Sequence, residues 1–598
     1  MDRIRERSEI PVADTWAIED LYASDEAWEQ ELSAIAQDKD FLAGFAGRLA
    51  ESGQTLYDYL YRSEMTDVKA SRLGNYCMRK SDEDTRNATY QAMTGRFTSV
   101  MVDLNAALSF ETPEIMAISD EQLDSFYADC PTLERYRRYL TNLRRKRGHI
   151  LSSAEEKLLA AAGELAQTPD TVYGMFADAD LKFADALDAA GKAHPVKQAT
   201  FVPLQNSPDR VLRKNAYDSL YKAFGDFKNT AAALLDAQNK QMKFFARARH
   251  YENAFEASLD STNVPTSVYL NLIEAVHRHM DKMHRYVRLR KKLLGLDELH
   301  FYDVYTPLVA DVDKKISFAE AKQTVCDALA PLGEDYRTIL REGFENRWID
   351  VYPNAGKRSG AYSAGAAVHP YVLLNFSGTL DSQFTLAHEM GHALHSYLSN
   401  KHQNPIDAHY VIFVAEVAST CNEALLMEYL LNKTTDRKER MYLINHFLEQ
   451  FKGTLYRQTM FAEFELNIGR MVAQGQTLTA DDLCAEYRRL NEEYFGPDMA
   501  VDDQIAVEWA RIPHFYYSYY VFQYATGYSA AIALSRRILR EGEKAVKDYL
   551  DFLSGGCSKS PIDLLKGAGV DMTGPEPVEA ALELFGQLLD EMEALAGE

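Results

Sequence analysis

One short segment constrains this chain more than any other: residues 384–395 carry the pattern His-Glu-x-x-His within a largely apolar run at helical spacing. Four residues advance an α-helix by about 6 Å and 400°, so His388 and His392 share one face and can bind one metal ion. Zinc suits two imidazoles, a carboxylate and a water, and it lowers the pKa of that water toward about 7. Glu389 is then placed to accept the water proton as hydroxide attacks a carbonyl carbon. The segment predicts a helix with a hydrolytic zinc site.

The motif alone does not identify the third protein ligand. His395 lies on the same predicted face, but it is seven residues from His388, about 10 Å along a helix, which is too far for one ion with bonds near 2 Å. A metzincin would place a histidine six residues after the second motif histidine, and that position holds Leu398. We therefore expect His395 to be structural and exclude the metzincin class.

A glutamate from a second helix is the other common third ligand of a zinc site with this motif. Residues 413–423 have helical spacing, and Glu416 and Glu423 lie seven residues apart on one face among mostly small or apolar neighbours. A carboxylate on such a face is costly to bury unless it is paired or binds a metal. We expect one of the two to bind the metal and the other to support it, with a solvent-facing pair as the alternative. Spacing alone does not choose between them.

Composition narrows the class of protein that surrounds this site. The chain has 598 residues, 46% hydrophobic and 26% charged, which excludes a disordered or collagen-like protein. The formal net charge of −24 repels phosphate backbones and anionic membrane surfaces, so no nucleic acid partner is expected. No uncharged apolar run approaches about 18 residues, so no membrane partner or membrane span is expected either.

The cysteines and the N-terminus bear on the cellular compartment. The six cysteines are scattered and form no Cys-x-x-Cys pair, which indicates neither a disulfide framework nor a thiolate zinc cluster. Residues 1–15 are charged and lack the apolar core of a signal peptide. Both features predict a cytoplasmic protein.

Helical periodicity dominates the organisation of the chain, so a mainly α fold is expected. The pattern changes between residues 178 and 210, where 181–183 and 199–203 suggest short strands and turns. We place a boundary near residue 190, which gives a helical N-terminal region of residues 1–190 and a catalytic region of residues 191–598.

Residues 351–379 break the helical rhythm with a glycine-rich loop. Gly356 and Gly360 flank Lys357 and Arg358, but the spacing is not that of a phosphate-binding P-loop. A role in holding a peptide fits better, because glycine permits close approach and hinge motion. The stretch 371–376 is predicted to be a short strand. It is either an edge strand that pairs with an extended peptide or a strand paired internally.

Together these motifs carry a family resemblance. The run from His388 to His395, followed by Phe413-Val-Ala-Glu416, resembles the thimet oligopeptidase family, and within it the oligoendopeptidase F branch. The likeness spans most of the chain, including the opening segment from Ala13 to Tyr22. It implies a large, two-lobed helical metallopeptidase with a deep substrate channel and a small β element near the active site. Residues 1–190 would form part of one lobe.

Carried over by position, the resemblance makes His388, His392 and Glu416 the ligands of one zinc ion per chain. It also makes Glu389 the general base, and Glu423 becomes a supporting residue.

A tyrosine-rich segment at residues 512–528 supplies the remaining catalytic groups that the resemblance implies. These are His514, Tyr520 and Tyr528, with Tyr517 and Tyr519 as alternatives to the two tyrosines. A neutral imidazole N–H or phenol O–H can stabilise the oxyanion of a tetrahedral intermediate. Tyrosines that pack without catalysing are the alternative for most of this segment.

The candidate contacts with substrate lie in the loop, in the predicted strand and in the tyrosine segment. They are Gly360, Tyr362, Leu373, Asn375 and Tyr517.

The predicted function is that of a zinc-dependent endopeptidase that hydrolyses internal bonds of short unstructured oligopeptides. One alternative is a metallocarboxypeptidase of a related helical fold, in which Arg511 or Arg358 would hold the terminal carboxylate. The other is a non-catalytic peptide-binding protein, which would purify without stoichiometric metal.

Overall fold

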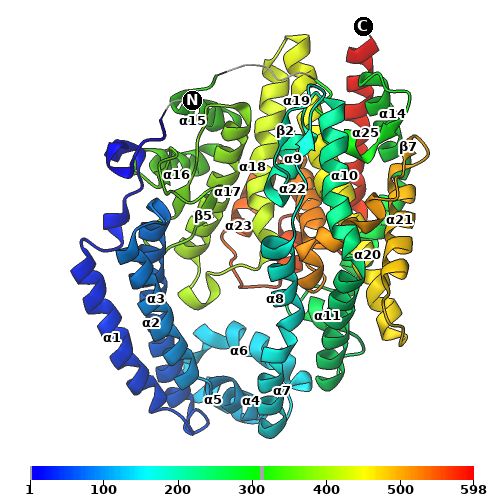
Figure 1. Cartoon of the computed structure of the whole chain (residues 1–598). Helices are drawn as coiled ribbons and strands as arrows, with labels where there is room; N and C mark the ends of the chain where they lie inside the picture. Colours follow the sequence, from blue (N-terminus) through cyan, green and yellow to red (C-terminus); the bar gives the residue numbers. More distant parts are fainter. Residues whose placement is uncertain (1–2, 310–314, 598) are drawn as a thin grey trace. The chain divides into compact units, whose positions relative to one another are not determined.

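The computed structural model describes residues 3–309 and 315–597 and is built mostly from helices (Figure 1). Contacts divide the chain into two compact units, each made of three separated stretches of sequence. Unit 1 comprises Met1–Gly148, Lys314–Tyr429 and Leu534–Gly569, and unit 2 comprises His149–Asp313, Leu430–Ala533 and Val570–Glu598. The predicted mainly α fold is confirmed, and the boundary near residue 190 stays a prediction.

Unit 1 packs its N-terminal helices around an aromatic and aliphatic core. α2 (Gly53–Glu83) contacts α1 (Asp25–Ala43) and α3 (Ala88–Ala107). The indole of Trp28 is fully buried and donates to the Leu73 carbonyl at 2.9 Å, which ties α1 to α2. Its other helices are α4 (Glu111–Ala117), α5 (Asp120–Asp129), α6 (Arg137–Arg144), α15 (Phe318–Ala328), α16 (Gly333–Glu345), α17 (Leu380–His402), α23 (Glu543–Leu553) and α24 (Pro561–Gly567).

Unit 2 is also helical. Two helices, α18 (Ile412–Lys433) and α22 (Phe522–Glu541), contain residues of both units. The helices of unit 2 are α7 (Ser153–Ala166), α8 (Thr168–Gly174), α9 (Gln198–Gln205), α10 (Arg210–Asp226), α11 (Lys228–Ala248), α12 (Ala254–Asp260), α13 (Thr266–Arg278), α14 (Met280–Leu293), α19 (Arg437–Gln450), α20 (Arg457–Ala473), α21 (Ala480–Phe495) and α25 (Glu576–Gly597).

The stretch where the sequence pattern changes is a short hairpin followed by a helix. β1 (Ala186–Leu187) pairs antiparallel with β2 (Ala193–His194), so this stretch holds short strands and a turn as expected. The strand suggested at 181–183 is wrong, because these residues lie before β1 and outside any strand. The strand suggested at 199–203 is wrong, because these residues lie in α9. α9 packs against α10 and buries Phe201, so tertiary packing overrides the local preference of its β-branched residues.

Unit 1 contains a small sheet beside the glycine loop. Its strand order is β4-β6-β5, formed by β4 (Ile349–Asp350), β6 (Tyr371–Leu373) and β5 (Tyr362–Ala364). β6 pairs parallel with β4 and antiparallel with β5. The edge-strand prediction for residues 371–376 is therefore wrong and the internal pairing is correct. Within the sheet as described, β5 is an edge strand.

The glycine loop is anchored by a buried ion pair. The Lys357 side chain is 1% exposed, pairs with Asp350 at 2.6 Å and donates to the Tyr352 carbonyl at 2.8 Å. Arg7 pairs with the same aspartate. The lysine ammonium is thus held inside the protein, in keeping with the rejection of a phosphate-binding role.

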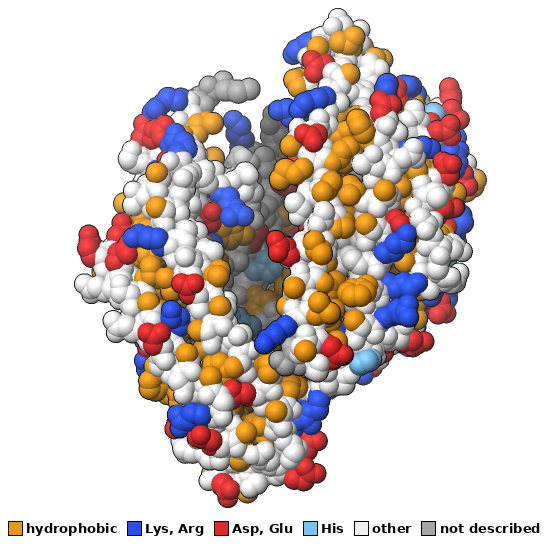
Figure 2. All heavy atoms as spheres, turned by 60° about the horizontal axis from the view of Figure 1, so that its bottom comes forward, with side chains coloured by type: hydrophobic (Ala, Val, Ile, Leu, Met, Phe, Trp, Pro, Cys, Tyr) orange, Lys and Arg blue, Asp and Glu red, His pale blue; other side chains and the backbone are white. Residues whose placement is uncertain are grey.

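The surface carries both signs of charge. On the face shown in Figure 2, lysine and arginine side chains are interspersed with aspartate and glutamate. Of the helices in the described ranges, none combines the length and apolar character that crossing a bilayer requires. The six cysteines carry free thiols.

A further pair of short strands, β3 (Leu299–His300) and β7 (Met499–Ala500), is parallel.

Candidate metal centre and catalytic residues

The predicted motif helix is α17. Thr379 caps its N-terminus by accepting the Ser382 N–H at 3.1 Å, which satisfies a donor that the helix leaves unpaired. Asp381 lies in the first turn and Lys401 in the last, so their charges complement the helix dipole. Most side chains between the two ends are buried, which fixes the orientation of the helix within unit 1.

A glycine between the motif histidines lets α17 and α18 approach closely. A Cβ atom at Gly391 would lie 2.6 Å from the Ser419 Cα and 2.8 Å from the Ala418 carbonyl oxygen. The buried Asn422 side chain donates to the Ala387 carbonyl at 3.1 Å and ties the same two helices. This close approach puts α18, and with it Glu416, beside the motif.

Replacing Gly391 with alanine should weaken metal binding. The added methyl must push α18 away from α17, and overpacking of this kind costs about 1–3 kcal/mol. If the helices relieve that strain by moving Glu416 away from the two histidines, the affinity for metal falls by roughly 5- to 150-fold. Competition with a chromophoric chelator measures the change. Gly163→Ala is the control, because beyond its chain neighbours and the adjacent backbone of its own helix no atom of the described residues lies within 4 Å of its Cβ position. Unchanged metal affinity in Gly391→Ala would show that helix spacing does not place Glu416.

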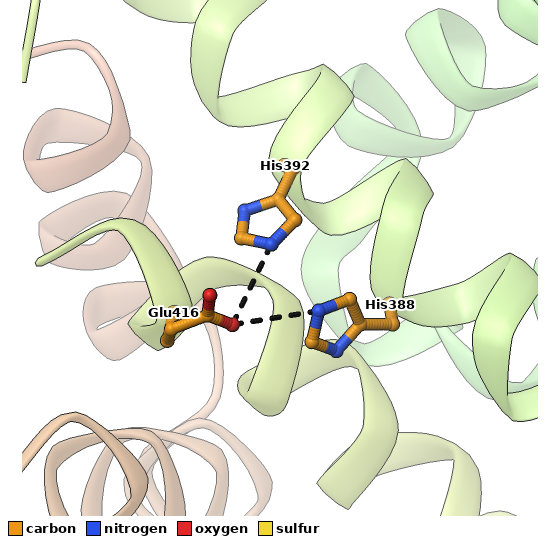
Figure 3. Close-up of side chains that lie close together, drawn as sticks. All are labelled: His388, His392 and Glu416. Atoms are coloured by element: carbon orange, nitrogen blue, oxygen red, sulfur yellow. Dashed lines mark ion pairs between the residues drawn. The ribbon is translucent and has the colours of Figure 1, made fainter. Parts of the chain in front are cut away.

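Three side chains bring one ligand atom each to a common point (Figure 3). Glu416 Oε2 lies 3.4 Å from His388 Nε2 and 3.5 Å from His392 Nε2. All three donor atoms are within 4.8 Å of one another. A tetrahedral ion with bonds of 2.0–2.1 Å separates its donors by about 3.3 Å, so this group fits a zinc ion. The structure brings Glu416 to the histidines, which the spacing had left open.

Glu423 supports the group from behind His388. Its Oε1 lies 2.5 Å from His388 Nδ1, so His388 Nε2 is the nitrogen that faces Glu416. Burial lowers the pKa of His388, but the hydrogen bond and charge of Glu423 outweigh it and raise that pKa to about 9. A carboxylate behind a histidine in this way fixes ring orientation and increases basicity.

The electrostatics of Glu416 favour its ionised form. Burial raises the pKa of Glu416, but the hydrogen bond and charge of His392 and the charge of His388 outweigh burial and lower that pKa to about 2. Ser419 donates to the same carboxylate at 3.1 Å. The group therefore offers an anionic oxygen at neutral pH.

Glu389 lies between the two motif histidines in sequence and is 6% exposed. Burial raises the pKa of its carboxyl. Within the described ranges its Oε2 makes no hydrogen bond. A buried carboxylate with an unused acceptor oxygen has what a proton acceptor needs.

His395 lies outside the three-residue group. It is 1% exposed and stacks on Tyr410, with ring centroids 3.7 Å apart and planes at 9°. Burial lowers the pKa of His395 to about 3, so its ring is neutral. This packing agrees with the structural role expected from the sequence.

The tyrosine-rich segment belongs to unit 2 as far as Ala533. The His514 ring lies 5.5 Å from Tyr517, 6.3 Å from Tyr520 and 6.1 Å from Tyr524, measured between ring centroids. Tyr524, which lies in the first turn of α22, was not among the sequence candidates. Tyr528 is 4% exposed and packs 5.1 Å from Phe451.

Tyr519 points away from this aromatic cluster. Ser518 and Tyr519 both adopt the left-handed backbone, with φ of +60° and +57°, which is strained for non-glycine residues. Glu465 accepts the Tyr519 N–H at 3.0 Å. A Cβ at Gly469 would lie 2.0 Å from the Tyr519 hydroxyl, so that hydroxyl sits against α20.

The candidate substrate contacts occupy different environments. Leu373 is fully buried in β6, whose two edges are both paired. Asn375 donates to the Gly360 carbonyl at 2.8 Å and so holds the loop. The Tyr362 hydroxyl donates to Asp82. Tyr517 is 48% exposed. The assignment of these residues to substrate stays a prediction.

The two arginines that a carboxypeptidase would need already have carboxylate partners. Arg511 lies 3.4 Å from Glu508 and its guanidinium packs over a phenylalanine ring. Arg358 lies 3.3 Å from Asp82. Each arginine thus already lies beside a carboxylate of the protein.

Comparison with known proteins places this site in a family. The profile of Peptidase family M3 matches residues 203–584, a range that contains the metal group and the tyrosine segment. The chain belongs to peptidase family M3. A second profile, Oligopeptidase F, matches residues 114–183. The resemblance to oligoendopeptidase F stated from the motifs is confirmed.

Individual relatives agree with this M3 assignment. Oligopeptidase PepF of Bacillus subtilis is 46% identical over 595 residues, which cover 99% of this chain and 89% of the relative. The crystal structure of oligoendopeptidase-F from Enterococcus faecium has a TM-score of 0.76 and 35% identity, covering 96% of this chain and 99% of that one. A solved chain from Chlamydophila abortus has a TM-score of 0.93 and 34% identity, covering 99% and 100%. The protein is a metalloendopeptidase of family M3.

Proposed function

We propose that this M3 peptidase is a zinc-dependent enzyme that cleaves internal bonds of short, unstructured oligopeptides. The observation that carries the proposal is the spacing of His388, His392 and Glu416, which fits one tetrahedral zinc ion. The names of the relatives, oligopeptidase and oligoendopeptidase F, support an oligopeptide substrate. A cytoplasmic location is part of the same proposal, in keeping with the scattered cysteines of the sequence.

One zinc ion per chain would be held by His388 Nε2, His392 Nε2 and Glu416 Oε2. When bound, zinc lowers the pKa of a water molecule and polarises a carbonyl. Glu423 orients the His388 ring through Nδ1 and so directs its Nε2 lone pair toward the site.

Glu389 moves the proton in this proposal. Its carboxylate accepts a proton from water as the water oxygen bonds to the scissile carbonyl carbon. The same carboxyl then gives the proton to the leaving nitrogen as the carbon–nitrogen bond breaks. Burial, which raises the pKa of Glu389, makes both transfers easier by bringing that pKa closer to neutral.

His514 and the phenols of the tyrosine segment stabilise the oxyanion in this proposal. Burial lowers the pKa of His514, so its ring is neutral at pH 7 and can donate an N–H. Tyr520 stacks beside it and offers a phenol O–H, and Tyr528 is the second proposed phenol. Gly360, Tyr362, Asn375 and Tyr517 are proposed to hold the peptide. Because Leu373 is fully buried and β6 is paired on both edges, Leu373 would act only by holding the strand in place.

Replacing His514 with alanine should lower kcat by about 10²- to 10³-fold while leaving the metal content unchanged, because an oxyanion donor is lost and no ligand is. Cleavage of an internally quenched peptide and metal analysis of the same sample give both quantities. His402→Ala, an exposed histidine in the last turn of α17, is the control. If metal were lost from His514→Ala, that residue would be a ligand.

The function is tested by mass spectrometry of the products from a peptide mixture and one folded protein, with and without ortho-phenanthroline. We expect internal cuts confined to the peptides and abolished by the chelator. Stepwise loss of residues from the C-terminus would replace the proposal with a carboxypeptidase. No cleavage by a zinc-loaded sample would leave only peptide binding.

A further inference from the structure

Unit 1 contains a cavity of about 410 Å³ next to the metal-site helix. Four segments line it: α2, the residues that follow β5, the second half of α17, and the segment that leads into α18. All four belong to unit 1. None of the roles discussed so far uses this cavity.

The cavity begins about one helical turn from the proposed metal ligands. Ser396, which lines it, follows His392 by four residues on α17, a rise of about 6 Å. Gly365, the residue directly after edge strand β5, lies so close that a Cβ there would be 3.0 Å from the Ser396 side chain. An extended peptide advances about 3.3 Å per residue. A side chain within about three residues of the cleaved bond can therefore reach this cavity.

Most of the wall is apolar, and one of its two carboxylates is already used. Val68, Ala366 and Ile406 supply aliphatic surface. Glu64 accepts from Arg135 at 2.8 Å and from the Ile406 backbone N–H at 3.1 Å, so both of its oxygens already have partners. It does not offer a free carboxylate to the cavity.

Asp67 is the carboxylate that remains. It has no hydrogen bond or ion pair within the described part of the chain. Partial desolvation, followed by the charges of Glu111 and Glu64, raises the pKa of Asp67 to about 6. At neutral pH the cavity therefore presents an ionised carboxylate that no hydrogen bond or ion pair of the described residues satisfies. A cation placed there would relieve this unfavourable arrangement.

We propose that this cavity is a specificity subsite for a lysine or arginine side chain of the bound peptide, with Asp67 as the residue that selects it. The proposal rests on the proposed peptidase function. The aliphatic wall packs against the methylene stem of such a side chain, and the ammonium or guanidinium pairs with the Asp67 carboxylate. The α-amino group of a peptide carries the same charge but lacks the methylene stem. It could therefore pair with Asp67 but would not pack against the aliphatic wall.

The test compares lysine with norleucine, which has a similar stem and no charge. N-acetylated, internally quenched peptides carry one or the other at each of three positions on either side of the cleaved bond. At one position we expect the wild-type enzyme to favour lysine by about 10- to 100-fold in kcat/KM, the effect of one charge-assisted hydrogen bond. Asp67→Asn and Asp67→Ser should each remove most of this preference and leave the norleucine peptides unchanged.

Asp103→Asn is the matched control, because it removes an exposed carboxylate from α3 in the same unit and should leave the preference intact. A wild-type enzyme that cleaves norleucine and lysine peptides equally at every position would overturn the proposal. So would equal loss of activity on all peptides in both Asp67 variants, or a preference seen only with a free α-amino group. Failure of the metal-loaded wild type to cut any norleucine peptide internally would refute the proposed function instead.

Discussion

Replacing Glu389 with glutamine is expected to lower kcat by about 10²- to 10⁴-fold and to leave the metal in place. The amide keeps the shape of the side chain but cannot accept the proton of the attacking water. The proposed ligands His388, His392 and Glu416 are untouched, and their donor spacing does not depend on Glu389. Steady-state cleavage of a quenched peptide and metal analysis of the same preparation measure the two quantities together.

The variant should also keep its stability, because Glu389 Oε2 has no hydrogen bond to lose within the described ranges. The midpoint of thermal unfolding checks this point. Glu345→Gln removes an exposed carboxylate from the end of α16 in unit 1 and serves as the control for the change of charge. Turnover near the wild-type level in a metal-loaded Glu389→Gln enzyme would refute the base assignment.

The helix and its histidine pair were predictable from sequence because both depend on local geometry. His388 and His392 are four residues apart, and α17 keeps them on one face. The choice between Glu416 and Glu423 was not predictable in the same way. It depends on the position of α18 along the axis of α17, and the contacts at Gly391 and Asn422 fix that position.

Two of the outcomes for the predicted strands have a common cause. The segment 371–376 was correctly expected to include a strand, but its pairing partners lie elsewhere in the sequence, and a strand pattern does not encode which edge stays free. The segment 199–203 carries β-branched residues, yet its contacts with α10 make it a helix. Both outcomes were decided by long-range contacts.

In the tyrosine segment, residue types predicted the candidate catalytic residues but not the positions of their side chains. The sequence identified His514 and a set of tyrosines, but it could not tell which rings would face the histidine. Ser518 and Tyr519 adopt the left-handed backbone, and the Tyr519 hydroxyl lies against α20. Tyr520 and Tyr524 are the rings that remain beside His514 together with Tyr517.

Replacing Glu416 with alanine should release more metal than replacing Glu423 with alanine. It removes one of only three proposed protein ligands, so we expect most of the zinc to be lost on dialysis against a weak chelator, and activity with it. Glu423→Ala keeps all three ligands and loses the contact to His388 Nδ1. Changes to such a supporting residue typically cost about 10- to 100-fold in metal affinity. Metal titration of both variants, with Glu345→Ala as control, measures the ranking.

The reverse ranking would mean that the carboxylates exchange roles when metal binds. Glu423 would then have to reach the ion, although it now contacts the Nδ1 atom of His388 while Glu416 faces the Nε2 atoms of both histidines. That exchange needs the His388 ring to turn over or α18 to shift along α17, and the backbone contact at Gly391 opposes a shift. Because both movements break contacts already made, we expect Glu416→Ala to release more zinc than Glu423→Ala.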